Sequence, residues 1–322
     1  MKTVELVVPC YNEEECVSLF YVRVKQVFES LKDYDFIITY IDDGSIDGTL
    51  AEIKKAARAA DQGKVQYISF SRNFGKEAAI YAGLSRSTGD YVALMDADLQ
   101  HPPELLKEML EAVENEGYDC AAARRISRRG EPKIRSFFAR AFYYLIKRVT
   151  VIDLVPGATD YRLMKRKMVE AIVSMTERER FTKGIYSWVG FRNKWIEYEN
   201  VERAAGKTKW NLRGLFSYAY HGFIAFATTP LRAVVYLGMW IVLFAVAYAV
   251  FVFISALSSS GARTGYASIL VILLLLGGII ITILGMIGEY LARIYMEVKK
   301  RPIYFERESN FEYDIKEKEN EG

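Results

Sequence analysis

The stretch that decides the fold reads Tyr91-Val92-Ala93-Leu94-Met95-Asp96-Ala97-Asp98-Leu99-Gln100-His101-Pro102-Pro103-Glu104. Its apolar beginning, 91–95, is typical of a buried β-strand, and the prolines prevent that strand from continuing. The strand ends on Asp96 and Asp98, and acids at the end of a buried strand are costly unless a cation lies on them. Mg²⁺ or Mn²⁺ is the natural candidate, because either ion takes one or two carboxylates and completes its coordination with water and phosphate oxygens. The alternative is a surface turn with an aspartate cap.

The first hundred residues alternate between apolar strands and helices. Strands are expected at 4–8, 36–41, 65–70 and 91–95, and helices at about 14–32, 49–60 and 76–87. This alternation predicts an α/β fold with a parallel sheet and right-handed crossovers. Ligands bind such sheets beyond the carboxyl ends of the strands. The polar clusters that fall there, 9–13, 42–45, 71–76 and 96–98, are therefore expected to form one site.

Several functional classes are disfavoured by missing motifs. No GxGxxG follows the first strand and no GxxxxGK[ST] occurs, which argues against a dinucleotide oxidoreductase and a P-loop NTPase. The net charge is only +3, and no nucleic-acid partner is expected. Cys10, Cys16 and Cys120 show no CxxC spacing, which favours structural thiols in a reducing compartment over a zinc site or a disulfide framework.

Two long apolar segments predict membrane spans. The chain is 51% hydrophobic, and the excess lies in 233–257 and 266–288, neither of which contains a charged residue. Each is long enough to cross about 30 Å of hydrocarbon as a helix. Spans are therefore expected at 231–257 and 266–290. The alternative is a pair of buried core helices, which would normally show a polar stripe.

The charges around these spans predict their orientation. Basic residues precede the first span at Arg232 and follow the second within 293–301, whereas the connecting loop carries only Arg263. No secretory signal is expected, since the first apolar run is short and contains Glu5. We expect a multi-pass protein of the inner (cytoplasmic) membrane, with a cytosolic catalytic domain at 1–210. A charge-rich cytosolic tail, partly disordered near its end, is expected at 291–322.

Two further segments suit a membrane surface. Within 211–230, apolar residues recur at helical spacing, at Leu212, Leu215, Phe216, Ala219, Phe223 and Phe226. This predicts an amphipathic helix lying in the interface, with packing against the catalytic domain as the alternative. Basic residues crowd one earlier segment, at Arg124, Arg125, Arg128, Arg129, Lys133, Arg135 and Arg140. Such a cluster is usually a solvated face, but near a membrane it can hold anionic headgroups or a phosphate.

Four motifs follow one another along the chain: Val8-Pro9-Cys10-Tyr11-Asn12-Glu13, Asp42-Asp43-Gly44-Ser45, Asp96-Ala97-Asp98-Leu99-Gln100 and Ala158-Thr159-Asp160-Tyr161-Arg162-Leu163-Met164. With them the chain resembles the family 2 glycosyltransferases of GT-A fold. More closely, it resembles the polyprenyl-phosphate glycosyltransferases, which include bacterial enzymes that load glucose onto undecaprenyl phosphate and dolichol-phosphate mannose synthases. The resemblance covers nearly the whole chain, with further motifs at 71–77, 180–184, 203–210 and 288–290.

The chain departs from this family pattern at two positions. Cys10 lies where the family often has valine or serine, a small-residue replacement that we expect to be neutral. His101 replaces an acid that is common at this position in the bacterial glucosyl branch, whereas mannose synthases also have histidine at this position. The second departure leaves the identity of the sugar open.

The resemblance implies a Rossmann-like domain that binds a nucleotide sugar. Asp43 would accept a hydrogen bond from the base, and the nucleoside pocket would be lined by Pro9, Tyr11, Asn12 and Glu13. Lys76 would reach the donor. From the residues alone, Asp43-Gly44 is also simply a good turn, and Lys76 is equally a solvated lysine at a helix start.

The same resemblance places a metal on the donor diphosphate. Asp96 and Asp98 would hold Mg²⁺ or Mn²⁺, which offsets charge on the leaving group, and Gln100 would support these ligands. Arg203 and Lys209 lie on a glycine-containing loop that is expected to close over the diphosphate and the acceptor.

The acceptor chemistry needs binding more than activation. A phosphate monoester has its second pKa near 6 and is already largely dianionic at neutral pH. Arginines bind such groups through bidentate bonds, and the family pattern assigns this role to Arg125, Arg128 and Arg135. Asp160 occupies the position of the family's proposed catalytic base. It is expected to orient the attack or accept a proton from the monoanion; the alternative is a structural pair with Arg162.

Taken together, the residues and the resemblance predict an inverting glycosyltransferase. It would move a hexose, glucose from UDP-glucose, to undecaprenyl phosphate on the cytosolic leaflet. GDP-mannose, UDP-GlcNAc and UDP-aminoarabinose are alternative donors. A processive polysaccharide synthase and a non-catalytic, membrane-anchored nucleotide-sugar-binding protein are alternative functions. Gly277, Gly278 and Gly285 in the second span make a homo-oligomer possible.

Overall fold

The computed structural model describes residues 1–126, 155–178, 180–199, positions 236, 238, 240, 241, 243–248 and 250, and residues 266–311. The chain divides into two compact units, one formed by 1–225 with 302–322 and the other by 226–301. The predicted interfacial helix at 211–230 lies outside the described residues, as do Arg128, Arg135, Arg203 and Lys209.

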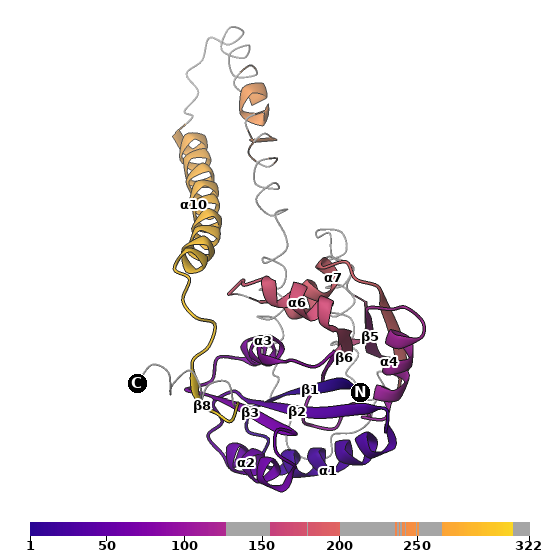
Figure 1. Cartoon of the computed structure of the whole chain (residues 1–322). Coiled ribbons are helices and arrows are strands. Elements are labelled where there is room, and N and C mark those ends of the chain that lie inside the picture. Colours follow the sequence, from indigo (N-terminus) through magenta and orange to yellow (C-terminus); the bar gives the residue numbers. More distant parts are fainter. Residues whose placement is uncertain are drawn as a thin grey trace, which may run out of the picture. The chain divides into compact units, whose positions relative to one another are not determined.

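The first unit is built on an eight-stranded mixed sheet, in the order β7-β5-β6-β4-β1-β2-β3-β8 (Figure 1). Its parallel centre consists of β1 (Lys2–Cys10), β2 (Tyr34–Asp42), β3 (Val65–Phe70) and β4 (Tyr91–Leu94). On one side, β6 (Ala158–Lys165) runs antiparallel to β4 and to β5 (Cys120–Arg125), and β7 (Asn193–Tyr198) is parallel to β5. On the other, β8 (Glu306–Ser309) is antiparallel to β3.

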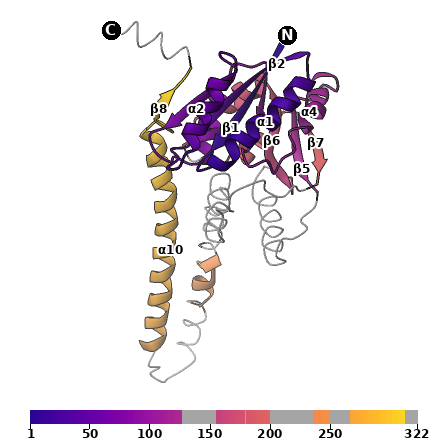
Figure 2. The same ribbon diagram turned by 90° about the horizontal axis from the view of Figure 1, so that it is seen from below.

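Helices cover both faces of this sheet. Figure 1 shows α1 (Glu14–Ser30) and α2 (Thr49–Ala59) on one face, and α3 (Lys76–Arg86) and α6 (Arg166–Ser174) on the other. Figure 2, seen from below, shows α1 and α2 in front of the strands. Two further described helices, α4 (Leu105–Glu114) and α7 (Thr182–Trp188), flank the antiparallel side. The α/β fold is therefore confirmed, with a mixed sheet instead of a wholly parallel one.

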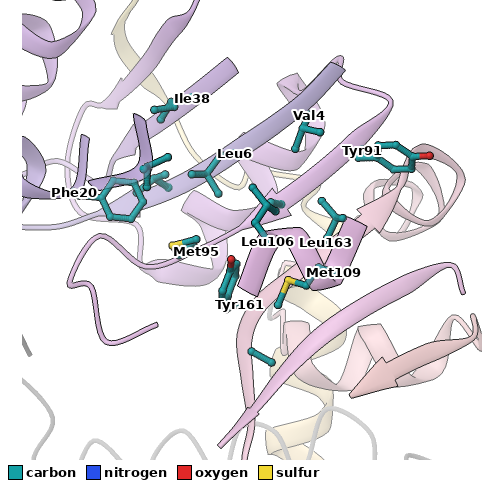
Figure 3. Close-up of a cluster of buried hydrophobic side chains, with 14 of the residues drawn as sticks. Val4, Leu6, Phe20, Ile38, Tyr91, Met95, Leu106, Met109, Tyr161 and Leu163 are labelled. Atoms are coloured by element: carbon teal, nitrogen blue, oxygen red, sulfur yellow. The ribbon is translucent and has the colours of Figure 1, made fainter. Parts of the chain in front are cut away.

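The core fastens the strands that carry the polar clusters. Figure 3 shows Leu6 and Met95 from the centre of the sheet together with Phe20 of α1, Leu106 of α4 and Tyr161 of β6. All five are at most 1% exposed. Burying a large apolar side chain contributes about 1.5–3 kcal/mol. The carboxyl ends of β1 and β4 are thus held by well-packed residues, which keeps the loops that follow them in place.

The predicted strands are confirmed, and two of them are longer than expected. The run 4–8 forms a strand from Lys2 to Cys10, and 36–41 one from Tyr34 to Asp42. The parallel pattern breaks after β4 because β6 returns in the opposite direction, pairing Leu94 with Arg162. Its neighbour β5 consists mainly of small side chains, Cys120-Ala121-Ala122-Ala123, which show little strand periodicity in the sequence.

The second unit contains α10 (Tyr266–Val298). In the part of the chain that the structure describes, it is the one helix long and apolar enough to cross a membrane, over Leu276–Val298. The helix continues beyond the expected end of the second span at 290, since nothing after Tyr290 breaks it before Val298. Glu289, one turn before Arg293, accepts a hydrogen bond from it at 3.2 Å. The first expected span, 231–257, lies mostly outside the described residues, and its described positions are helical.

The beginning of the tail expected at 291–322 contains a helix and a strand. It contributes the last turns of α10 and then β8, which extends the sheet of the first unit. β8 begins with three charged residues in a row, Glu306, Arg307 and Glu308, and therefore lacks the apolar alternation that would indicate a strand in the sequence.

Candidate active site

The loops after β1 and β2 form one connected edge. Cys10 and Asp42 pair at the ends of the two strands. Beyond them, the Asn12 backbone N–H donates to Ser45 Oγ at 2.9 Å, and Asn12 Oδ1 accepts from the N–H of Ile46 at 2.9 Å. Asn12 adopts a φ of 52°, a left-handed conformation that asparagine tolerates. The turn that carries Pro9, Tyr11, Asn12 and Glu13 is thereby held against the loop that carries Asp43.

Asp43 joins this edge to the loop before α3. Its buried carboxylate accepts the backbone N–H of Phe74 at 2.7 Å and that of Gly75 at 3.0 Å. Burial raises the pKa of Asp43 to about 6, against the opposing effect of these two hydrogen bonds. Gly44 has a φ of +64°, and a Cβ there would lie 2.3 Å from the carbonyl carbon of Arg72. Asp43-Gly44 is therefore more than a good turn, because both residues fasten the 71–75 loop.

Three predicted residues meet at Lys76, the first residue of α3. The Lys76 ammonium lies 2.7 Å from Asp96 Oδ1, just after β4, and 2.7 Å from Asp160 Oδ2 on β6. The Lys76 side chain is 38% exposed, and its ammonium bridges the two carboxylates. The interpretation of Lys76 as a merely solvated lysine is wrong.

The environment of Asp160 favours its charged form. Burial alone would raise the pKa of Asp160, but the Lys76 ammonium outweighs it, with a further contribution from Lys183, and holds the pKa well below its ordinary value. Arg162 contributes less to this effect. It donates instead to the Thr159 carbonyl at 3.0 Å and stacks on the ring of Tyr186 of α7 at 3.4 Å. Lys76, and not Arg162, is the main partner of Asp160.

Asp98 lies in a tight turn directly after β4. Its Oδ1 accepts the backbone N–H of Gln100 at 3.1 Å, and Leu99 between them has a φ of 56°. Leucine rarely adopts this conformation, and such backbone strain concentrates at functional sites. Asp96 and Asp98 present hard oxygen donors of the kind that Mg²⁺ and Mn²⁺ prefer, and Asp96 already attracts a cation. These residues fit a divalent metal.

Such a metal would need ligands from the substrate. Among the residues that the structure describes, no three His, Cys, Asp or Glu side chains are grouped so that they could hold a metal ion by themselves.

Two residues near Asp96 and Asp98 were not assigned a role from the sequence. His101 is buried, its Nδ1 lies 2.7 Å from Tyr198 Oη, and its Nε2 lies 4.0 Å from Asp96 Oδ2. Burial lowers the pKa of His101, which favours the neutral ring. Tyr198 ends β7, and no sequence signal connects it with the acidic turn. Arg125 pairs with Tyr198 in the sheet, which brings this predicted acceptor residue to the same edge.

A second missed contact joins the starts of α3 and α7. The Glu77 carboxylate accepts the backbone N–H of Thr182 at 2.9 Å and also the Thr182 hydroxyl. Burial raises the pKa of Glu77. The link places Lys183, the next residue of α7, where its charge acts on Asp160. The motif at 180–184 was noticed in the sequence, but nothing in it indicated this partner.

Comparisons with known proteins identify relatives of this chain. The family model described as "Glycosyl transferase family 2" matches residues 5–173. The chain is 43% identical to the glycosyltransferase CsbB of Bacillus subtilis (strain 168), over 95% of this chain and 92% of that protein. It is 40% identical to the "Prophage bactoprenol glucosyl transferase homolog" of Escherichia coli (strain K12), over 94% of this chain and 97% of that protein. A crystal structure of mannosyl-3-phosphoglycerate synthase from Rubrobacter xylanophilus matches 74% of this chain and 75% of its own at 20% identity, with a TM-score of 0.47.

Proposed function

The chain belongs to glycosyl transferase family 2, and from this premise we propose that it transfers glucose from UDP-glucose to the phosphate of undecaprenol, with inversion at the sugar carbon. It is a glycosyltransferase, and relatives named as bactoprenol glucosyl transferases support a polyprenyl phosphate as acceptor and glucose as the sugar. The observation that carries the proposal is the contact of Lys76 with both Asp96 and Asp160. It brings the residues proposed for the donor diphosphate and for the acceptor within one ammonium group of each other.

The donor would bind along the ends of β1, β2 and β4. We assign the nucleoside pocket to the 9–13 turn and Asp43. A hydrogen bond of Asn12 joins this turn to the loop after β2, and a hydrogen bond of Gly75 joins Asp43 to the loop before α3. Asp96 and Asp98 would hold Mg²⁺ or Mn²⁺, which supplies Lewis acidity to the departing diphosphate. The Lys76 ammonium beside Asp96 would also stabilise the negative charge that develops on the departing diphosphate. The backbone N–H of Gln100 holds Asp98 in its turn.

The acceptor phosphate arrives ionised, so Asp160 need not act as a strong base. A carboxylate whose pKa is held well below its ordinary value is a weak proton acceptor at neutral pH. We therefore assign to Asp160 the role of orienting the acceptor and keeping Lys76 and Lys183 in place. Arg125, with Arg128 and Arg135 from the same basic segment, would bind the acceptor phosphate, because arginine forms bidentate bonds to such groups.

The lipid acceptor requires a membrane, and α10 supplies a helix suited to one. A polyprenyl chain does not leave the bilayer, so its phosphate is accessible only at the surface. We propose a cytosolic catalytic unit anchored by more than one span, of which the second is α10 and the first lies within 231–257.

Product formation tests the function directly. Purified full-length protein in detergent would be incubated with Mn²⁺, undecaprenyl phosphate and each of UDP-glucose, UDP-GlcNAc, UDP-aminoarabinose and GDP-mannose, and the lipid fraction would be analysed by mass spectrometry. We expect a hexosyl-phosphate lipid with UDP-glucose, and none from Asp96→Asn protein. Product with another donor alone would overturn the assignment of glucose, and absence of any glycolipid across the panel would overturn the reaction.

A further inference from the structure

The segment that follows α10 returns to the catalytic sheet and pairs along its edge. β8 lies beside β3 (Figure 1). It runs antiparallel to β3, with Ile68 opposite Ser309 and Ser69 opposite Glu308. Asn310 closes the pairing, since its Oδ1 accepts the backbone N–H of Tyr67 at 2.6 Å and its Nδ2 donates to the Val65 carbonyl at 3.0 Å. The strand is therefore docked along β3 by backbone and side-chain contacts.

Ion pairs from β8 reach the helices on both sides of the sheet. Glu306 accepts a hydrogen bond from Arg86 of α3 at 3.0 Å, and Glu308 lies 2.6 Å from Lys54 of α2. These pairs are partly exposed, and each contributes little to stability alone. The backbone pairing with β3 therefore sets the register of β8, and these pairs add little to it.

The residues before β8 pack on the loop that holds Asp43. The Tyr304 ring stacks on Phe70 at 4.7 Å between centroids, and the Phe305 carbonyl accepts the backbone N–H of Ser71 at 2.9 Å. The Phe305 ring lies 6.2 Å from that of Phe74. Phe74 is the residue whose N–H binds Asp43 Oδ1. The returning segment thus supports the 71–75 loop from its outer side.

The Arg307 side chain of β8 begins a series of connected hydrogen bonds. Arg307 donates to Ser69 Oγ at 3.1 Å, and Ser69 donates to Asp42 Oδ2 at 2.7 Å. The other oxygen of Asp42 accepts the backbone N–H of Ser45 at 3.0 Å. Ser45 Oγ in turn accepts from Asn12. Four hydrogen bonds therefore connect the strand after α10 with the loop proposed to bind the nucleoside.

We propose that Arg307 of β8 is a positioning residue for nucleotide-sugar binding. Arg307 holds the Asp42–Ser45 turn through Ser69, while Tyr304 and Phe305 hold the 71–75 loop, and Asp43 lies between these two supports. The chain that leaves α10 is thus both a connection to that helix and a brace of the pocket. This inference rests on the proposed function for the identity of the ligand, but not for the bracing itself.

Arg307→Ala tests the brace, and Glu308→Gln is the matched control. Both substitutions remove one charged side chain from β8, but Glu308 points to Lys54 and has no part in the chain to Asp42. Ser69→Ala interrupts the same chain within β3, and serves if Arg307→Ala protein does not fold. Full-length proteins in detergent are compared by steady-state kinetics with UDP-glucose and undecaprenyl phosphate. Hydrogen exchange of peptides covering 42–49 and 70–76 is measured without ligand.

We expect Arg307→Ala and Ser69→Ala to raise KM for UDP-glucose about three- to tenfold, with kcat and KM for undecaprenyl phosphate unchanged. Exchange in both peptides should be faster than in wild type, and Glu308→Gln should match wild type in every measurement. Equal exchange and equal KM in Arg307→Ala and wild type would overturn the inference. Failure of wild type to use UDP-glucose would instead overturn the proposed donor, and the exchange data would still decide whether β8 braces the loops.

Discussion

The Lys76 ammonium donates to Asp160 Oδ2 at 2.7 Å, although the two residues are 84 positions apart. Asp96, after a different strand, shares the same ammonium. Three elements of the fold, α3, β4 and β6, therefore place one cation between two carboxylates. Without Lys76, Asp96 and Asp160 would lose the positive charge between them. Their negative charges would then repel a diphosphate or a phosphate.

Lys76→Met should abolish most of the activity. The side chain keeps a similar length but loses the charge that bridges Asp96 and Asp160. Under the proposed function, the diphosphate and the acceptor phosphate would then lose a stabilising cation. We expect kcat to fall about 10²-fold or more, as when an electrostatic donor is removed from other active sites. Initial rates of glycolipid formation at saturating substrates measure this change.

Lys194→Met is the control for that variant. Lys194 also forms a close ion pair, 2.7 Å from Glu116, but at the surface and away from the acidic turn. Its rate should equal that of wild type. Equal rates for Lys76→Met and Lys194→Met would show that the cation at position 76 plays no part in catalysis.

Asp160→Asn should lower kcat by about 10²-fold, the effect of misplacing a reacting group. The pKa of Asp160 lies well below its ordinary value, so the carboxylate is ionised across the whole range from about pH 5 to 8. The ratio of wild-type to variant rates should therefore stay constant over that range. Turnover near that of wild type at every pH would exclude a catalytic role, and a ratio that rises steeply with pH would restore Asp160 as a titrating base.

Much of the parallel half of the sheet could be predicted from the sequence, because its apolar runs are separated by amphipathic helices and end on polar clusters. Asp43 and Asp96 were placed at one edge on that ground alone. The contacts between the clusters could not be predicted in the same way. The sequence left open whether Asp160 acts in catalysis or forms a structural pair with Arg162. The antiparallel return of β6 beside β4 brings Asp160 to Lys76.

The parts that sequence reasoning missed are those without a periodic signal. Tyr198 reaches His101 across 97 positions because β7 is added next to β5, not next to its neighbour in the chain. β8 is four residues long and lies in a charged tail. Leu99 adopts a left-handed backbone conformation that no preference of leucine would suggest. Each of these depends on long-range packing that overrides local preference.

Gly44→Ala should destabilise the protein strongly. The new Cβ would lie 2.3 Å from the Arg72 carbonyl carbon, and the residue would keep a φ of +64°. Gly63→Ala is a matched control, because its φ is +78° but nothing lies within 4 Å of the added atom. The control should cost about 1–2 kcal/mol of unfolding free energy, the penalty for the backbone conformation alone. Gly44→Ala should cost clearly more in thermal or denaturant unfolding; equal losses would mean that Arg72 moves aside freely.

Tyr198→Phe should lower stability by about 1–3 kcal/mol, because it leaves the buried Nδ1 of His101 without its 2.7 Å partner. The His101 ring, 4.0 Å from Asp96, would also be less well oriented, and we expect a several-fold loss of kcat/KM. Tyr40→Phe provides the comparison, since the Tyr40 hydroxyl is buried and has no hydrogen-bond partner among the described residues. It should be neutral or slightly stabilising. If both variants unfold at the same temperature as wild type, the Tyr198–His101 contact contributes nothing.

Donor binding should weaken below about pH 6, where Asp43 titrates. The pKa of Asp43 in the folded protein is about 6, above its ordinary value of 3.8, because the carboxylate is buried. Between these two pH values the folded protein binds more protons than the unfolded chain, so this group makes the unfolding free energy fall as pH rises through the window, and adds no pH dependence above it.

The carboxylate that would accept from the base and from Phe74 exists only above the window. Affinity for UDP-glucose, chosen because its diphosphate diester lacks the phosphate ionisation near pH 6 that UDP has, should therefore fall up to about tenfold per unit below pH 6. Calorimetric titration of wild type and Asp43→Asn at matched pH values measures this, and the variant should bind weakly with little pH dependence. A wild-type affinity that is constant from pH 5 to 8 would remove Asp43 from the donor site.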